Sequence, residues 1–160
     1  MTHRVGLGWD VHRLVAGRPC TLGGIVLDHE AGPSGHSDGD AVLHALGDAL
    51  LGAAGLDDLG TLFPDTDPEW KGANSADLLQ EILVRVRDAG WSLVNADIVI
   101  QTEGPRIAPK RAEMRARIAK LCGVDANRIN VKGKTLEGLG SMAGGAAVAV
   151  QAVVLVDRLS

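Results

Sequence analysis

The last strand-like segment of the chain places the strongest constraint on its fold. Residues 146–156, AAVAVQAVVLV, contain a single polar side chain, and a run of this kind predicts a strand that is buried on both faces. In a chain of 160 residues, one of the two covering surfaces can come from another subunit. Residues 2–9 predict a second strand, but this one alternates, so its two faces differ.

The remaining elements complete an α+β pattern. Apolar periodicity and turn residues predict strands at 92–102 and 128–135, one or two short strands at 19–27 broken at Gly23-Gly24, helices at 38–54, 75–89 and 109–121, and loops at 32–35 and 60–74. This order predicts a mixed sheet covered by helices on one side. Neither a repeat nor a linker interrupts the pattern, so we expect a single domain over residues 1–160.

The helix at 38–54 is the best defined of these elements. Its apolar stripe has helical spacing and consists of Leu43, Leu46, Leu50 and Leu51. Ser37 with Asp40 three positions later resembles a capping box, which would fix the start of the helix. His44 then falls within its first two turns. For the next helix, Ser75 is the predicted cap and Gly90 the predicted end.

A candidate metal site begins with Asp10 and His12. On a strand, the pattern Asp-x-His places both side chains on one face with Cα atoms about 7 Å apart. Gly6 and Gly8 share that face, which predicts room for something bulky beside the pair. With His44 as a third ligand, a carboxylate and two imidazoles suit Zn²⁺ and leave a fourth position open for a substrate oxygen. The alternative is that the three are unrelated polar residues.

Charge and cysteine content restrict the partners and the compartment. A formal charge of −4 argues against a nucleic-acid surface, which needs a basic patch. Two cysteines, Cys20 and Cys122, show no pairing signature and favour a reducing compartment. The N-terminus lacks a signal-peptide core, and no apolar stretch is long enough to span a membrane. We therefore expect a soluble, cytoplasmic protein without a nucleic-acid or membrane partner.

Several polar residues have both a functional and a plain structural interpretation. His36 and Ser37 precede a helix N-terminus, which attracts anions, but Ser37 and Asp40 can equally be caps. Asp65 and Asp67 lie beside prolines, where they commonly form turns. At the end of the strand at 128–135, a phosphate and Mg²⁺ site or a solvated edge would each explain the residues Lys132, Lys134, Thr135 and Glu137.

Taken together, these segments resemble the 2-C-methyl-D-erythritol 2,4-cyclodiphosphate synthase family. The matching stretches are GWDVHRL (8–14), LGG (22–24), HSDGDAVLHALGDALLGAAGLDDLG (36–60), FPDTDPEWKGANS (63–75), VNADIVIQTEGPRI (94–107) and INVKGKTLEGLG (129–140). They are long, colinear and cover most of the chain. The resemblance implies an α+β homotrimer with active sites at the subunit interfaces. It also implies a lyase of the non-mevalonate isoprenoid pathway that closes a cyclic diphosphate and releases CMP from a cytidine diphosphate substrate.

The resemblance also assigns site residues. It implies Zn²⁺ on Asp10, His12 and His44, Mg²⁺ or Mn²⁺ held through Glu137, and His36 and Thr135 as catalytic residues that steady the phosphates. The implied contacts to the methylerythritol phosphate are Asp10, Val11, His12, His36, Ser37, Asp58, Leu59, Gly60, Phe63, Pro64, Asp65, Thr66 and Asp67. The implied contacts to the CMP part, from a neighbouring subunit, are Thr102, Glu103, Gly104, Pro105, Arg106, Ile107, Ala108, Lys134, Thr135, Leu136 and Glu137.

Two departures from the family pattern bear on function. Family members carry an aromatic residue and then Gly-Arg-Gly-Glu-Gly before the last strand, whereas residues 141–147 here are SMAGGAA, with Gly144 and Ala146 at the arginine and glutamate positions. A lost cation beside phosphate weakens binding by about 1.5–3 kcal/mol, which Lys134 or Arg106 would have to offset. Arg106 itself stands where lysine is common. A zinc phosphohydrolase and a trimeric ligand-binding scaffold are the alternative functions.

Overall fold

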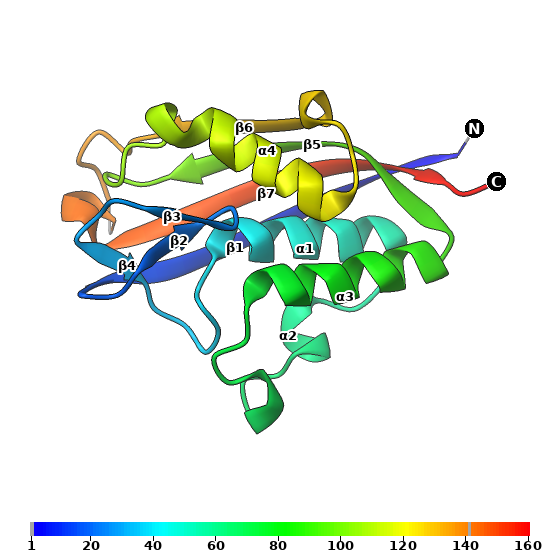
Figure 1. Cartoon of the computed structure of the whole chain (residues 1–160), viewed down its shortest axis with the longest axis horizontal. Helices are drawn as coiled ribbons and strands as arrows, with labels where there is room; N and C mark the ends of the chain where they lie inside the picture. The colour runs from blue at the N-terminus through cyan, green and yellow to red at the C-terminus, as the bar shows by residue number, and fades with distance from the viewer. Residues whose placement is uncertain (1, 141) are drawn as a thin grey trace.

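The computed structural model describes residues 2–140 and 142–160 and has the expected α+β architecture (Figure 1). Within these residues, five strands form a mixed sheet in the order β4-β1-β7-β5-β6. Their bounds are β1 His3–Ala16, β4 Ala31–Pro33, β5 Trp91–Gln101, β6 Ile129–Lys134 and β7 Ala147–Arg158, and a separate hairpin pairs β2 Cys20–Leu22 with β3 Ile25–Leu27. Strands β5 and β6 are parallel, and the other pairs are antiparallel.

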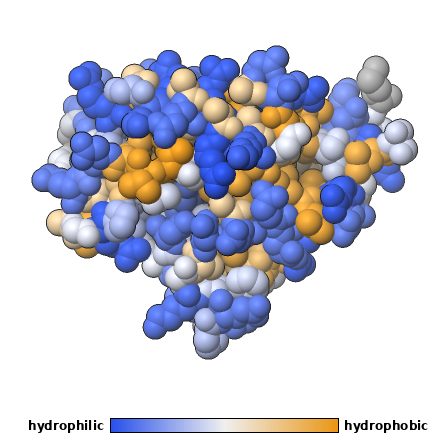
Figure 2. Space-filling model, viewed as in Figure 1, coloured by the Kyte–Doolittle hydropathy of each residue, from blue (hydrophilic) through white to orange (hydrophobic). Residues whose placement is uncertain are grey.

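Three long helices lie on one side of the sheet (Figure 1). They are α1 (Ala41–Ala54), α3 (Ser75–Asp88) and α4 (Arg111–Cys122), and the short helices are α2 (Leu59–Leu62), η1 (Pro68–Trp70), η2 (Ala108–Lys110), η3 (Ala126–Arg128) and η4 (Ala143–Gly145). Figure 2 shows hydrophobic patches between mostly hydrophilic surfaces on the side with these helices. Among the described residues, no helix has the length and hydropathy that crossing a bilayer requires.

Helix α1 packs against β1 at very close range, because the facing residues are small. Gly6 and Gly8 are buried on that face of β1. A Cβ at Gly8 would lie 1.9 Å from the carbonyl oxygen of Ala45, and one at Gly6 would lie 1.8 Å from that of Ala49. The expectation that these glycines leave room for a bulky group was wrong, because the backbone of α1 fills the space. The same close approach carries His44 toward Asp10.

The opposite face of β1 is apolar and uncovered in the single chain. Val5, Leu7, Trp9 and Val11 are 67, 68, 55 and 40% exposed. On the neighbouring β7, Val153 is 44% exposed, and it pairs with Leu7. The expectation that residues 146–156 are buried on both faces is therefore not met within one chain. The helix-facing side chains of β7, such as Val150, Val154 and Val156, are fully buried; on the other face Ala149 is also buried, but Gln151 and Val153 are exposed.

The start of α1 is fixed by Asp40 rather than by Ser37. The Asp40 carboxylate accepts hydrogen bonds from the backbone N–H groups of Val42 and Leu43 within α1, and from those of Gly23 and Gly24 at the turn between β2 and β3. The predicted capping box was wrong, because Asp40 is itself the N-cap of α1 and its carboxylate accepts all four of these hydrogen bonds. The predicted cap of α3 was also one residue late: Asn74 accepts the hydrogen bond from Ala76 N.

The other differences from the predicted elements involve segments that pair over long distances. Strand β1 continues from residue 9 to Ala16, because its second half pairs with the start of β7 and with β4. Strand β4 itself occupies part of the predicted loop at 32–35. The predicted loop at 60–74 contains most of α2 and all of η1. The hairpin broken at Gly23-Gly24 and the three long helices are confirmed.

Candidate metal centre and active site

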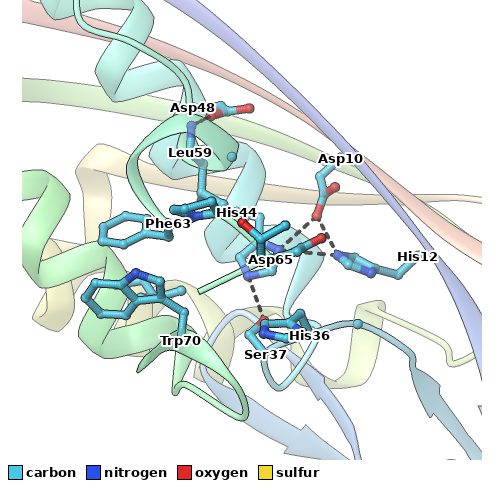
Figure 3. Close-up of a pocket in the computed structure, with 15 residues that line it drawn as sticks. Asp10, His12, His36, Ser37, His44, Asp48, Leu59, Phe63, Asp65 and Trp70 are labelled. Carbon is cyan, nitrogen blue, oxygen red and sulfur yellow. Dashed lines mark hydrogen bonds and ion pairs between the residues drawn. The ribbon is translucent and has the colours of Figure 1, made fainter. Parts of the chain in front are cut away.

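Three side chains from two elements converge beside the first turn of α1 (Figure 3). Asp10 and His12 come from the helix-facing side of β1, and His44 comes from α1. Asp10 Oδ2 lies 2.9 Å from His12 Nε2 and 3.1 Å from His44 Nδ1. The two histidine nitrogens lie 3.3 Å apart. Among the described residues, this is the group of histidine and acidic side chains with the geometry to hold a metal ion.

One hydrogen bond outside the cluster orients the ring of His12. Its Nδ1 lies 2.6 Å from the carbonyl oxygen of Ser34, so Nδ1 carries a proton and donates it, and in the neutral ring the Nε2 lone pair faces the cluster. Burial lowers the pKa of His12. The hydrogen bond to Asp10 and the negative charge of Asp10 together raise the pKa by more than burial lowers it, so the net shift is upward. Burial raises the pKa of Asp10, while the hydrogen bonds from His12 and His44 hold it well below the ordinary carboxyl value.

The donor set fits zinc. Bonds of 2.0–2.1 Å at tetrahedral angles place ligand atoms about 3.3 Å apart, and the three distances here are 2.9, 3.1 and 3.3 Å. One carboxylate oxygen and two imidazole nitrogens form a borderline-soft set of the kind zinc prefers. A zinc ion held by these three ligands would have a fourth coordination position free for a substrate oxygen, as catalytic rather than structural zinc sites do.

Zinc affinity is expected to fall as the pH drops below the raised pKa of His12. A proton and a metal ion compete for the same Nε2 lone pair, so affinity should weaken about tenfold per pH unit in that range. The metal-free protein has the opposite trend: the raised histidine pKa stabilises the fold below pH 6.5, and this stability is lost as the pH rises through the raised value. Chelator competition and melting between pH 5 and 8 measure both trends. A zinc affinity that is constant over this range would contradict the ligand assignment.

The cluster forms part of the wall of a cavity of about 560 Å³. This cavity brings together most residues predicted to contact the methylerythritol phosphate: Asp10, His12, His36, Ser37, Leu59, Gly60, Phe63, Pro64, Asp65 and Thr66. Phe63 and Trp70 pack edge to face with ring centroids 4.9 Å apart and line the side opposite the cluster (Figure 3).

Sequence reasoning missed other residues that line this cavity, chiefly Asp48 and Trp70. Asp48 lies four residues after His44 and so shares its face of α1, a spacing that could have identified it. Its carboxylate accepts a hydrogen bond of 2.8 Å from Leu59 N, and burial raises its pKa. The contact attaches α2 to α1. Trp70 has no comparable spacing to the cluster residues, because it lies in η1, within a segment that the sequence predicted as a loop.

The residues predicted to hold CMP lie elsewhere in the chain. A separate cavity of about 140 Å³ is lined by Thr102, Glu103, Pro105, Arg106, Ile107, Ala108, Arg111, Gly133, Lys134 and Thr135. Gly104 lines an adjoining hollow. The Glu103 carboxylate accepts hydrogen bonds of 3.1 Å from both Leu136 N and Gly138 N, which fixes the turn that carries Glu137. Glu137 has a φ of 54° and its carboxylate accepts a hydrogen bond from the Thr135 hydroxyl.

Apart from Gly104, five predicted residues line neither cavity: Val11, Asp58, Asp67, Leu136 and Glu137. Val11 faces the uncovered side of β1. Asp58 and Asp67 cap α2 and η1 by accepting hydrogen bonds from Thr61 N and Glu69 N. In the segment that departs from the family pattern, Ser141 lies outside the described residues, and Gly144, at the arginine position, has a left-handed φ of 73° in η4.

An α+β domain with a three-ligand carboxylate and imidazole site open to a cavity defines a class of candidate metal-dependent enzymes. The family model described as YgbB family matches residues 3–157. A 2-C-methyl-D-erythritol 2,4-cyclodiphosphate synthase from Bordetella petrii is 49% identical over 98% of this chain and 97% of its own length. The chain belongs to this family, and the resemblance drawn from the motifs is confirmed.

Solved structures of the same family superimpose on this chain. One described as 2C-methyl-D-erythritol-2,4-cyclodiphosphate synthase in a CDP-bound form superimposes with a TM-score of 0.89 at 42% identity, over 96% of this chain and 100% of that one. The bifunctional IspDF from Campylobacter jejuni gives a TM-score of 0.95 at 39% identity over 99% of this chain. The present chain spans 43% of that longer protein.

Proposed function

We propose that the chain converts 4-diphosphocytidyl-2-C-methyl-D-erythritol 2-phosphate into 2-C-methyl-D-erythritol 2,4-cyclodiphosphate and CMP. The observation that supports this most strongly is the Asp10, His12 and His44 cluster, which shares one cavity with His36 and Ser37. Relatives that match nearly the full length carry the name of this activity. The reaction is an intramolecular phosphoryl transfer, which needs positioning and charge neutralisation more than a protein nucleophile.

The chain's own residues position the substrate phosphates. A zinc ion bound to the cluster would supply Lewis acidity toward an oxygen of the diphosphate. His36 Nε2 is buried and, among the side chains that the structure describes, has no hydrogen-bond partner. A phosphate oxygen in the cavity would satisfy it. The wall made of Phe63 and Trp70, with α2 attached through Asp48, would hold the methylerythritol part and exclude water.

The cytidine part would bind to the second cavity of a neighbouring subunit. Among the residues that the structure describes, none lines both that cavity and the cavity of the metal cluster, so one chain alone would bind only half of the substrate. The CDP-bound relative supports a cytidine nucleotide as the ligand. Lys134, Thr135 and Glu137 lie at the end of β6 and on the turn after it, and Glu137 offers a carboxylate for Mg²⁺ or Mn²⁺ at the diphosphate.

The proposed assembly is a homotrimer, which the uncovered face of β1 supports. Val5, Leu7, Trp9 and Val11 form an apolar row that a monomer would leave in water, and contiguous apolar surfaces of this kind mark subunit interfaces. Native mass measurement is expected to give three chains per particle, and Leu7→Glu, at the most exposed of these positions, to give monomers with little turnover. Val84→Glu, on the outer surface of α3, is the control and should stay trimeric. A fully active wild-type monomer would contradict a shared site.

The family's arginine is absent here, because Gly144 stands at its position. We propose that two cations of the second cavity, Arg106 and Lys134, take over its contact with phosphate. The double variant Arg106→Ala with Lys134→Ala should raise the Michaelis constant by about 100-fold or more, because two charge-assisted contacts to phosphate of about 1.5–3 kcal/mol each are lost. Steady-state kinetics measure the change. A normal Michaelis constant in the double variant would refute the replacement.

Turnover of the cytidine substrate, with product analysis, tests the proposed function. The cyclic diphosphate and CMP should form in equal amounts, and prior removal of metal ions by a chelator should abolish both. A linear phosphate product without the cyclic diphosphate would indicate the phosphohydrolase instead. No turnover from folded, zinc-loaded protein would favour the ligand-binding scaffold.

A further inference from the structure

The two ring nitrogens of His44 have different surroundings. Nδ1 faces the cluster, 3.1 Å from Asp10 Oδ2 and 3.3 Å from His12 Nε2. Nε2 points the other way, 2.8 Å from the hydroxyl of Ser75 and 3.2 Å from that of Ser37. A metal ion on Nδ1 requires an unprotonated Nδ1, so the ring proton has to be on Nε2 and needs an acceptor there.

Ser75 is held so that its oxygen can be that acceptor. It is the first residue of α3 and is 1% exposed. Its hydroxyl makes a short hydrogen bond to Asp38 Oδ1, and its backbone N–H donates to Asp38 Oδ2 at 3.1 Å. Because an ionised carboxylate only accepts, the Ser75 hydroxyl donates its proton to Asp38. Its lone pairs are then free to accept the Nε2–H of His44.

We infer that Asp38 and Ser75 are positioning residues that select the metal-binding tautomer of His44. The hydrogen bonds run in one direction, from His44 Nε2–H to the Ser75 oxygen and from the Ser75 hydroxyl to the Asp38 carboxylate. This leaves the Nδ1 lone pair directed at the metal position. The inference rests on the proposed zinc site. It gives a role to two residues that sequence reasoning treated as a helix cap and as part of a motif.

Two further hydrogen bonds attach the loop that carries His36 and Ser37 to the segment just before α3. Gly72 N donates to the carbonyl oxygen of His36 at 2.8 Å, and Asp38 N donates to that of Ala73 at 3.2 Å. Ser37, whose hydroxyl accepts a hydrogen bond from Gly39 N, remains on the cavity side. Ser75 can therefore serve the metal ligand while the Ser37 hydroxyl is left for the substrate.

Zinc affinity, measured by chelator competition on the purified full chain, tests the inference. Ser75→Ala is expected to weaken zinc binding by about 10- to 100-fold, as loss of a hydrogen-bond partner behind a ligating histidine typically does. Asp38→Asn keeps the shape of the side chain but removes its charge, and should weaken binding in the same direction by a smaller factor. Neither variant removes a metal ligand.

The control is Asn74→Ala, which removes the adjacent cap of α3 without touching His44. It should lower the melting temperature of the metal-free protein and leave the zinc dissociation constant unchanged. If Ser75→Ala and Asp38→Asn also lower only the melting temperature, their role is structural and the inference is overturned. If the wild-type protein itself binds no zinc, the proposed metal site fails together with the inference.

Discussion

His44→Ala is expected to abolish zinc retention and, with it, turnover. The substitution leaves only Asp10 and His12 as ligands, and the roughly 10–16 kcal/mol of a four-ligand zinc site corresponds to about 3 kcal/mol per ligand. Affinity should therefore fall by at least about 100-fold. Elemental analysis after dialysis measures the retained zinc, and the turnover assay measures the consequence.

A second histidine provides the matched control for this experiment. His3 lies at the start of β1 and pairs with Asp157 at 3.3 Å, with 44% of its side chain exposed. His3→Ala should retain zinc and turnover at wild-type levels, because its ring is remote from the cluster. Full zinc occupancy in His44→Ala would contradict the ligand assignment, whatever the activity of the variant.

Gly8→Ala is expected to destabilise the protein by about 3 kcal/mol or more, the upper range for overpacking of a core. The added Cβ would meet the Ala45 carbonyl oxygen at 1.9 Å and Ala49 N at 2.7 Å. Both are backbone atoms of α1 and cannot rotate away, so the helix has to move off β1. Denaturant unfolding measures the loss of stability, and zinc titration of the folded fraction should show weaker binding because His44 moves with the helix.

The control for this variant is a glycine on the same helix. Gly52 lies on the exposed side of α1, and an added Cβ there has no neighbour within 4 Å. Gly52→Ala should stabilise the protein by about 0.5–1 kcal/mol, because alanine is the better helix former. Equal stabilities for Gly8→Ala and wild type would show that β1 and α1 do not pack as closely as described.

Patterns of neighbouring residues predicted the convergence of the three candidate metal ligands. The alternation of β1 placed Asp10 and His12 on one face, and the leucine stripe placed His44 near the start of a helix. The structure brings their ligand atoms together. The family motifs then assigned most of the cavity that the structure shows, including His36 and Phe63.

Long-range pairing accounts for what the sequence did not predict. The extension of β1 beyond residue 9 depends on partners more than one hundred residues away in β7 up to Arg13, and on β4 from Leu14 to Ala16. The cap of α1 is Asp40 and not the predicted Ser37. Its carboxylate also accepts hydrogen bonds from Gly23 and Gly24, which lie in a turn distant in sequence. The Asp38, Ser75 and His44 contacts likewise join residues from three segments, which no spacing along the chain indicates.

Anomalous scattering at the zinc absorption edge, from crystals grown with zinc, tests the central claim most directly. The account predicts one strong peak about 2.0–2.1 Å from Asp10 Oδ2, His12 Nε2 and His44 Nδ1, with its open side toward the cavity that contains His36. A peak at another position, or none where these three atoms converge, would contradict it.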